Sequence, residues 1–100
     1  MAEMVLSTAQ IESKLPTLPG WKLEGGALAK EMGFADFTEA FAFVTRLALL
    51  GEKTGHHPDI VLRYNQLRIG LVSHDAGGIT QRDLAMAGQI QSMIGNTRAQ

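Results

Sequence analysis

The sequence predicts a two-layer α+β fold in the order α-ββ-α-ββ-α, with helices packed on an antiparallel sheet. Two observations lead to this prediction. A pair of short β-rich segments separated by turn residues occurs twice, and each pair precedes a longer stretch with apolar residues at helical spacing. Because 100 residues are too few for two independent hydrophobic cores, we expect residues 1–100 to form a single domain.

A short helix and a first hairpin should open the fold. Ser7 begins a capping-box pattern, completed three residues later by a glutamine, which predicts a helix over about 8–15. Prolines and a glycine then interrupt the helical pattern. The Gly25-Gly26 pair separates two β-rich segments at 21–24 and 28–34, so these segments should form a β-hairpin.

The longest helix is expected over about 37–53. Asp36 and Glu39 form a second capping-box pattern, and Gly55 is well placed to end the helix. The apolar residues that recur at helical spacing in this segment are Phe37, Ala40, Phe41, Val44, Leu47 and Ala48. The phenylalanines of this helix are expected to pack in the core, and they are Phe37, Phe41 and Phe43.

A second hairpin and a final helix should complete the fold. The segments 60–64 and 67–72 are short and β-rich, and Asn65-Gln66 separates them. The side chains of the second strand that should face the core are Leu67, Ile69 and Leu71. Thr80 should cap the last helix, and Gly95-Asn96 should end it. The apolar residues of that helix are Leu84, Ala87, Ile90 and Ile94.

Composition excludes several classes of function. The formal net charge is -1 and no segment concentrates basic residues, which argues against direct nucleic-acid binding. The absence of cysteine excludes disulfides, thiolate metal sites and cysteine nucleophiles. The sequence shows neither a signal-peptide pattern nor a membrane-spanning stretch, so we expect a cytoplasmic protein. An open sheet leaves edges and one face uncovered, which predicts a homo-oligomer.

The histidines are the strongest functional signal in the sequence. All three lie between positions 56 and 74, at His56, His57 and His74. If Tyr64 pairs with Leu67 around a two-residue turn, Pro58 lies opposite Ser73 and His57 lies opposite His74. Imidazole has a pKa near 6.5, so such a cluster can both donate and accept a proton at neutral pH. The pattern therefore predicts general acid-base catalysis.

Two other interpretations of the histidines stay open. They could be strand-end residues that are exposed or bonded to neighbouring backbone, without a role in chemistry. They could also be three zinc ligands with an open fourth position. Adjacent residues such as His56 and His57 project in different directions, which counts against the zinc interpretation.

Other side chains could support a site around the histidines. The nearby carboxylates are Glu52, Asp59, Asp75 and Asp83. Asp83 lies three residues after Thr80, so it could cap the last helix or contact a substrate. Trp21 and Tyr64 could each offer a flat surface to an aromatic ligand, or pack as ordinary aromatic residues of strands.

These residues form a pattern that resembles a known family. The segment EKTGHHP at 52–58, Tyr64, the segment HDAGGIT at 74–80 and Asp83 resemble the signature of the pterin-4a-carbinolamine dehydratases. The resemblance covers nearly the whole chain. It implies a four-stranded antiparallel sheet with three helices, which we expect on one face, and assembly into homodimers or homotetramers. It implies no bound metal or organic cofactor.

The resemblance also implies roles for individual residues. His56, His57 and His74 resemble the catalytic histidines of the family. The residues that match family positions near the pterin substrate are Pro58, Ser73, Asp75, Ala76, Glu52, Trp21, Arg82 and Asp83. From the expected hairpin pairing, our hypothesis is that His57 and His74 form the main acid-base pair, with His56 in a positioning or substituting role.

The implied reaction is the dehydration of a 4a-hydroxytetrahydropterin to quinonoid dihydropterin and water, in support of tetrahydrobiopterin recycling. The alternative is a dehydratase-like binding protein that acts as a dimerisation cofactor, coactivator or assembly chaperone. Retention of all three histidines favours the enzyme. An additional role in binding another protein would leave no mark in the sequence.

Overall fold

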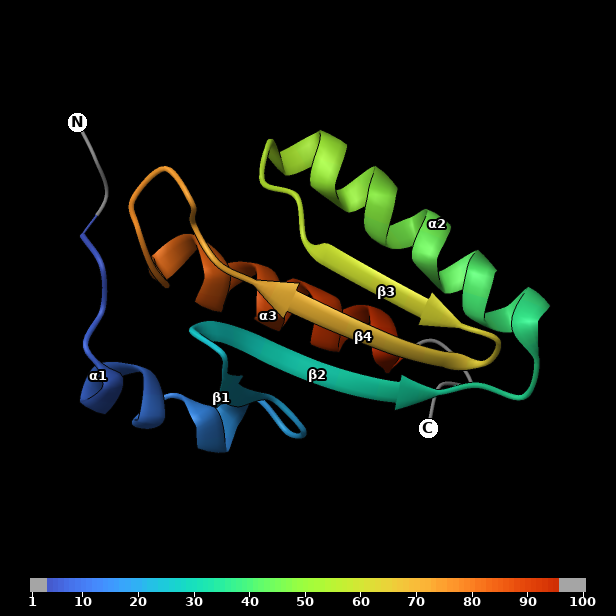
Figure 1. Ribbon diagram of the computed structural model, residues 1–100, viewed down its shortest axis with the longest axis horizontal. Coiled ribbons are helices and arrows are strands. Elements are labelled where there is room, and N and C mark those ends of the chain that lie inside the picture. The colour runs from blue at the N-terminus through green and yellow to red at the C-terminus, as the bar shows by residue number, and fades with distance from the viewer. Residues whose placement is uncertain (1–3, 96–100) are drawn as a thin grey trace.

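The computed structural model describes residues 4–95 and confirms the α+β fold. The elements in chain order are α1 (Thr8–Glu12), the 3₁₀ helix η1 (Leu15–Thr17), β1 (Lys22–Glu24), β2 (Ala27–Gly33), α2 (Phe37–Thr54), β3 (Asp59–Arg63), β4 (Gln66–Leu71) and α3 (Gln81–Ile94). The sheet has the strand order β1-β2-β4-β3 with every neighbouring pair antiparallel. In Figure 1 the strands lie in front of α3, while α2 runs along the β3 side. Within residues 4–95, no helix combines the length and apolarity needed to cross a bilayer.

The helix ends follow the capping patterns in the sequence. The Ser7 side chain accepts a hydrogen bond from the backbone of Gln10 and so begins α1. The first helix is shorter than predicted, since α1 ends at Glu12 and Pro16 lies in the separate helix η1. Gly55 ends α2 with φ 73°, a left-handed conformation that glycine adopts without strain. At the predicted end of α3, Gly95 is the cap and Asn96 lies outside the described residues.

One hydrophobic cluster joins the inner face of the sheet to the helices. Leu67, Ile69 and Leu71 of β4 are at most 1% exposed, as predicted. Their partners in the cluster include Leu28 of β2 and Phe43 of α2. The helices and these strand side chains share the cluster, so the helices cover this face of the sheet.

The opposite face of the sheet carries charged side chains. On this face the Arg68 guanidinium lies 2.5 Å from a Glu24 carboxylate oxygen and 3.8 Å from one of Glu31. These residues come from β4, β1 and β2, so the ion pairs run across neighbouring strands. An arginine hydrogen bond and charge lower the pKa of Glu24 below its usual value of 4.5.

The prediction that all the helix phenylalanines pack in the core is wrong for two of them. Phe43 is 2% exposed, but Phe37 and Phe41 are 48% and 53% exposed. Helix α2 turns Ala40, Phe43 and Leu47 toward the sheet, and Phe41 follows Ala40, so it projects about 100° away around the helix axis. Phe37 is the first residue of the helix. The exposed rings contact each other instead, with centroids 5.8 Å apart.

The pairing of the second hairpin also differs from the prediction. Leu67 pairs with Leu62 rather than with Tyr64, so the predicted pairs Pro58–Ser73 and His57–His74 do not form. Tyr64 takes φ 53° and begins the two-residue turn, as the primed turns of hairpins require. Asn65, the second turn residue, bonds the Phe34 carbonyl through its side-chain amide, so the strand restarts one residue earlier than expected.

Beyond β4, the chain leaves the hairpin instead of continuing it. The Ser73 backbone N–H donates to the Gly78 carbonyl at 2.9 Å, and the two residues form an isolated bridge. Ser73 is therefore paired within its own loop and is not available to Pro58. The offset in the hairpin is an even number of residues, so every side chain of β4 stays on its predicted face.

Candidate active site

The structure places all three histidines at one end of the second hairpin. His56 and His57 lie between α2 and β3, and His74 lies in the loop that follows β4. The start of β3 and the end of β4 meet at the same edge because the strands are antiparallel. Figure 1 shows both connections at the same end of the sheet. The histidines are thus neighbours by topology, although they do not pair across the ladder.

His56 is held by a buried carboxylate. Its Nε2 lies 2.6 Å from Oδ1 of Asp83, the third residue of α3. The His56 side chain is 12% exposed, and the Asp83 side chain is fully buried. A charge-assisted hydrogen bond this short fixes the orientation of the imidazole ring.

Asp83 has the capping role that the sequence left open, and it also holds the histidine. Its Oδ2 accepts from the Thr80 backbone N–H and from the Ser73 hydroxyl, both at 2.9 Å. The Thr80 side chain completes a capping box at the start of α3. Asp83 is 0% exposed, so its contacts are with protein groups.

His57 pairs with Glu52 at the surface. Its Nε2 lies 2.5 Å from a carboxylate oxygen of Glu52, and the two side chains are 58% and 76% exposed. The imidazole packs over Gly51 in the last turns of α2, where a Cβ would lie 3.1 Å from Cδ2 of His57. Gly51 is not among the site residues predicted from the sequence. A glycine inside a helix costs about 1 kcal/mol relative to alanine, so its presence signals a close approach.

His74 has the most open environment of the three. Its Nε2 lies 3.9 Å from a carboxylate oxygen of Asp59, which is too long for a hydrogen bond, and both side chains are largely exposed. In the same loop, Arg82 donates to Asp75 at 2.8 Å. This hydrogen bond, with a smaller effect of the arginine charge, lowers the pKa of Asp75 below its usual value. The loop thus presents an imidazole beside an ion pair.

Each histidine therefore faces a different carboxylate: Asp83, Glu52 or Asp59. Among residues 4–95, no three His, Asp or Glu side chains are grouped so as to hold a metal ion. The arrangement orients imidazoles, and oriented imidazoles can exchange protons with a bound molecule.

Comparisons with known proteins identify the family. A family model described as pterin 4 alpha carbinolamine dehydratase matches residues 4–93. The chain belongs to this family. It is 45% identical over 89 residues to a protein of Acidobacterium capsulatum, which covers 89% of this chain and 97% of that protein. It is 46% identical over 90 residues to a protein of Chloroflexus aurantiacus, covering 90% of this chain and 97% of that protein. Both carry the provisional name pterin-4-alpha-carbinolamine dehydratase.

The fold is also that of a solved member of the dehydratase family. A crystal structure described as a transcriptional coactivator/pterin dehydratase from Brucella melitensis superposes with a TM-score of 0.82 and 32% identity. It covers 89% of this chain and 97% of that chain. The three-helix, four-stranded architecture expected from the sequence is thus shared with this protein.

Trp21, carried over from the dehydratase resemblance, does not join the histidines. It is 5% exposed, and its Nε1 donates to Gln91 at 3.1 Å. Gln91 lies eight residues beyond Asp83 on α3, which is about 12 Å along the helix axis. Tyr64 lies at the turn end of the hairpin, away from the histidines. Both aromatic residues are therefore left out of the proposed site.

The remaining residues carried over from the family lie in the two segments that hold the histidines. Pro58 is half-buried and its Cδ would lie 3.4 Å from a Cβ at Gly51. The Ala76 backbone N–H donates to the Ser73 carbonyl and closes the turn after His74. These residues shape the loops, and their contact with a pterin stays a prediction.

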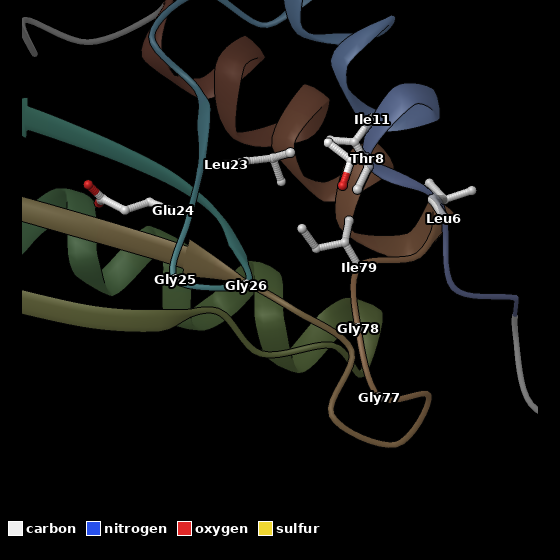
Figure 2. Close-up of a pocket in the computed structure, with 10 residues that line it drawn as sticks. All are labelled: Leu6, Thr8, Ile11, Leu23, Glu24, Gly25, Gly26, Gly77, Gly78 and Ile79. Atoms are coloured by element: carbon white, nitrogen blue, oxygen red, sulfur yellow. The ribbon is translucent and has the colours of Figure 1, made fainter.

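A separate hollow lies beside residues 77–79 of the loop that follows His74. Figure 2 shows it between the N-terminal segment, the Gly25-Gly26 turn and the Gly77-Gly78 loop, with Glu24 at its rim. Its volume is about 420 Å³, and side chains such as Leu23 line it. The histidines and their carboxylate partners are not among its lining residues.

Proposed function

We propose that this protein dehydrates a 4a-hydroxytetrahydropterin to quinonoid dihydropterin and water, by acid-base catalysis from its histidines. The observation that carries the proposal is the presence of three imidazoles, each beside a carboxylate, at one end of the sheet. Membership of the dehydratase family supports the choice of a pterin substrate. Recycling of tetrahydrobiopterin in the cytoplasm is the role that we infer for the reaction.

The elimination needs two proton transfers. One group must protonate the departing 4a hydroxyl, while another accepts the proton on N5, and each such role contributes roughly 10²- to 10⁴-fold to the rate. Imidazoles can fill both roles near neutral pH. The observed hairpin register removes the reason for pairing His57 with His74, so we assign the roles from the carboxylate partners instead.

The pterin would lie between the two histidine segments. Around His56 and His57, the proposed walls are Glu52 and Pro58. On the side of His74, the proposed walls are the turn residues Asp75, Ala76 and Arg82. Ser73 and Asp83 are 1% and 0% exposed, and their polar side-chain atoms are bonded to each other, so we give them a supporting role rather than a direct contact.

The test is an assay in which absorbance monitors the dehydration of a synthetic 4a-carbinolamine. His56→Ala, His57→Ala and His74→Ala should each lower kcat by roughly 10²- to 10⁴-fold. The control is Arg63→Ala, an exposed residue at the other end of β3, which should leave the rate unchanged. Wild-type protein without activity, or three histidine variants within a factor of about two of wild type, would overturn the proposal.

The exposed apolar surface of α2 favours a second property of this protein, which is self-assembly. Phe37, Phe41 and Leu49 are 48%, 53% and 64% exposed, and the Brucella relative is described as a coactivator as well as a dehydratase. A surface of this kind marks a protein contact. We propose that a second copy of this chain covers it, in a homodimer or homotetramer, as the open sheet and its edges also suggest.

Sedimentation velocity tests the assembly. The wild-type protein should sediment as a dimer or tetramer, and Phe41→Asp should shift it toward monomer. A wild-type monomer would exclude self-assembly. Assembly without any carbinolamine activity would favour the alternative, a dehydratase-like binding protein.

A further inference from the structure

The start of α3 holds a buried polar network around Asp83. Asp83 is fully buried, yet it receives hydrogen bonds on both oxygens. Oδ1 is 2.6 Å from His56 Nε2, and Oδ2 is 2.9 Å from both the Thr80 backbone nitrogen and the Ser73 hydroxyl. Among residues 4–95, every buried side-chain nitrogen or oxygen has a partner, so the network is complete.

The directions of the hydrogen bonds follow from the number of hydrogens available. The Ser73 hydroxyl has one hydrogen, and it donates that hydrogen to Asp83. The 2.9 Å contact between the Ser73 and Thr80 hydroxyls must then be donated by Thr80. This direction is consistent with the Thr80 hydroxyl oxygen, which accepts from the Arg82 backbone N–H. The two hydrogens at Oδ2 of Asp83 therefore both point toward the carboxyl group.

The hydrogen bonds at Oδ2 and the position of Asp83 in α3 both favour a carboxylate. An ionised carboxyl group only accepts hydrogen bonds, which matches the two donors that point at Oδ2. Its place in the first turn of α3 also favours negative charge, since the helix dipole is positive at that end. An imidazole nitrogen that hydrogen-bonds to a carboxylate must carry a hydrogen, so an ionised Asp83 places the hydrogen of His56 on Nε2.

The other ring nitrogen of His56, Nδ1, is available to a bound molecule. No hydrogen bond to Nδ1 of His56 occurs within the described part of the chain, and no buried nitrogen there lacks a partner. Nδ1 therefore reaches the protein surface. In the neutral ring this nitrogen carries the lone pair that can accept a proton.

We propose that Asp83 is a positioning residue that acts through His56: it fixes the Nε2–H tautomer and makes Nδ1 the nitrogen that accepts the N5 proton of the pterin. This inference rests on the proposed dehydratase function. As the proton leaves N5 for Nδ1, the N5 electron pair forms the N5=C4a bond. The C4a–O bond breaks, and the hydroxyl leaves as water with a proton from a second, protonated imidazole.

The same geometry explains why the other carboxylates cannot replace Asp83. The Glu52 and Asp59 side chains are 76% and 69% exposed, so water can hydrate either carboxylate and compete for the imidazole that it faces. Only the His56–Asp83 pair among the three is shielded from water. A single tautomer should therefore be enforced at His56 and not at His57 or His74.

The direct test is the tautomer of His56, read from ¹⁵N–¹H correlation spectra of the wild-type protein, with signals assigned by histidine substitution. The neutral His56 ring should carry its hydrogen on Nε2. His57 and His74 should behave as mixtures of the two tautomers. A neutral His56 with its hydrogen on Nδ1 would overturn the proposal without any reference to activity.

Asp83→Asn tests the positioning role in the enzyme. The amide oxygen would stay with the Thr80 and Ser73 donors, and the amide nitrogen would then face His56 and require a hydrogen on Nδ1. We expect the tautomer to invert and kcat to fall roughly 10²-fold or more, with KM little changed. The limb of the kcat pH profile that reports the base should also move.

Asp36→Asn is the matched control. Asp36 also caps a helix, by accepting from the Glu39 backbone, but it contacts no imidazole. Asparagine is as good a cap as aspartate, so this variant should keep wild-type kcat and wild-type spectra. If Asp83→Asn keeps both the Nε2–H tautomer and the pH profile, the positioning role is wrong. If wild-type protein shows the expected tautomer but no dehydration, the proposed function fails instead, and with it the role of Nδ1.

Discussion

Gly51→Ala should separate the stability of the fold from the geometry of the site. A Cβ at this position would lie 3.1 Å from Cδ2 of His57, 3.4 Å from Cδ of Pro58 and 3.5 Å from the His56 carbonyl oxygen. The last two distances are ordinary contacts, so the conflict is confined to the His57 imidazole. That ring is 58% exposed and can move by a few tenths of an ångström.

The magnitude follows from two opposing effects. Alanine replaces glycine inside α2, which favours the helix by about 1 kcal/mol. Displacing an exposed ring costs less than repacking a core, so the free energy of unfolding should stay constant or rise by up to about 1 kcal/mol. The displaced ring no longer has its original position relative to Glu52, which lies 2.5 Å from it in the wild type. We therefore expect kcat to fall about tenfold or more while stability is kept.

The assay pairs urea denaturation with carbinolamine dehydration, and Gly88→Ala is the control. Gly88 also lies inside a long helix, but nothing lies within 4 Å of a Cβ built there. Its substitution should raise stability by about 1 kcal/mol with unchanged kcat. If Gly51→Ala keeps full activity, the position of His57 over Gly51 does not matter for catalysis. A loss of more than about 2 kcal/mol would show instead that the 56–58 segment cannot move.

Two further changes test the electrostatics and the buried network. Arg68→Ala should raise the pKa of Glu24 toward its usual 4.5, because the arginine hydrogen bond and charge are the largest causes of its lowering. In the wild type this lowered pKa adds stability above about pH 4.5 that is lost as the pH falls through the folded-state value, and an unchanged Glu24 titration by ¹³C NMR would refute the assignment. Ser73→Ala removes a buried donor to Asp83 and should cost about 1–3 kcal/mol in urea denaturation, whereas the exposed control Ser13→Ala should cost under about 0.5 kcal/mol.

Most of the fold could be predicted because its signals are local. Capping boxes at Ser7 and Thr80 and the left-handed end at Gly55 each depend on residues within one or two turns of a helix. The inward face of β4 followed from simple alternation. The exposure of Phe37 and Phe41 could not be predicted in this way, because which apolar stripe of a helix faces the sheet is decided by packing.

The predicted register of the second hairpin was wrong because the contact that sets the register joins residues far apart in the sequence. Asn65 was correctly expected at the turn, but its side chain bonds Phe34, which is 31 residues earlier in the chain. That contact places Asn65 second in the turn and assigns the first position, with its positive φ, to Tyr64. A two-residue sliding of the pairing leaves every face of the strand unchanged, so the pattern of apolar residues carries no information against it.

In the candidate site too, contacts between distant residues could not be predicted: the sequence indicated the histidines but not which carboxylate each one faces. The close spacing of the histidines in the sequence predicts a site, and topology alone brings them to one end of the hairpin. The partner of His56 is a helix cap 27 residues away, and capping by itself would explain Asp83 completely. Capping uses one carboxylate oxygen and leaves the other free, so a buried capping aspartate can hold a second group at almost no additional desolvation cost. The start of α3 is therefore both the structural support of the helix and the element that orients the imidazole.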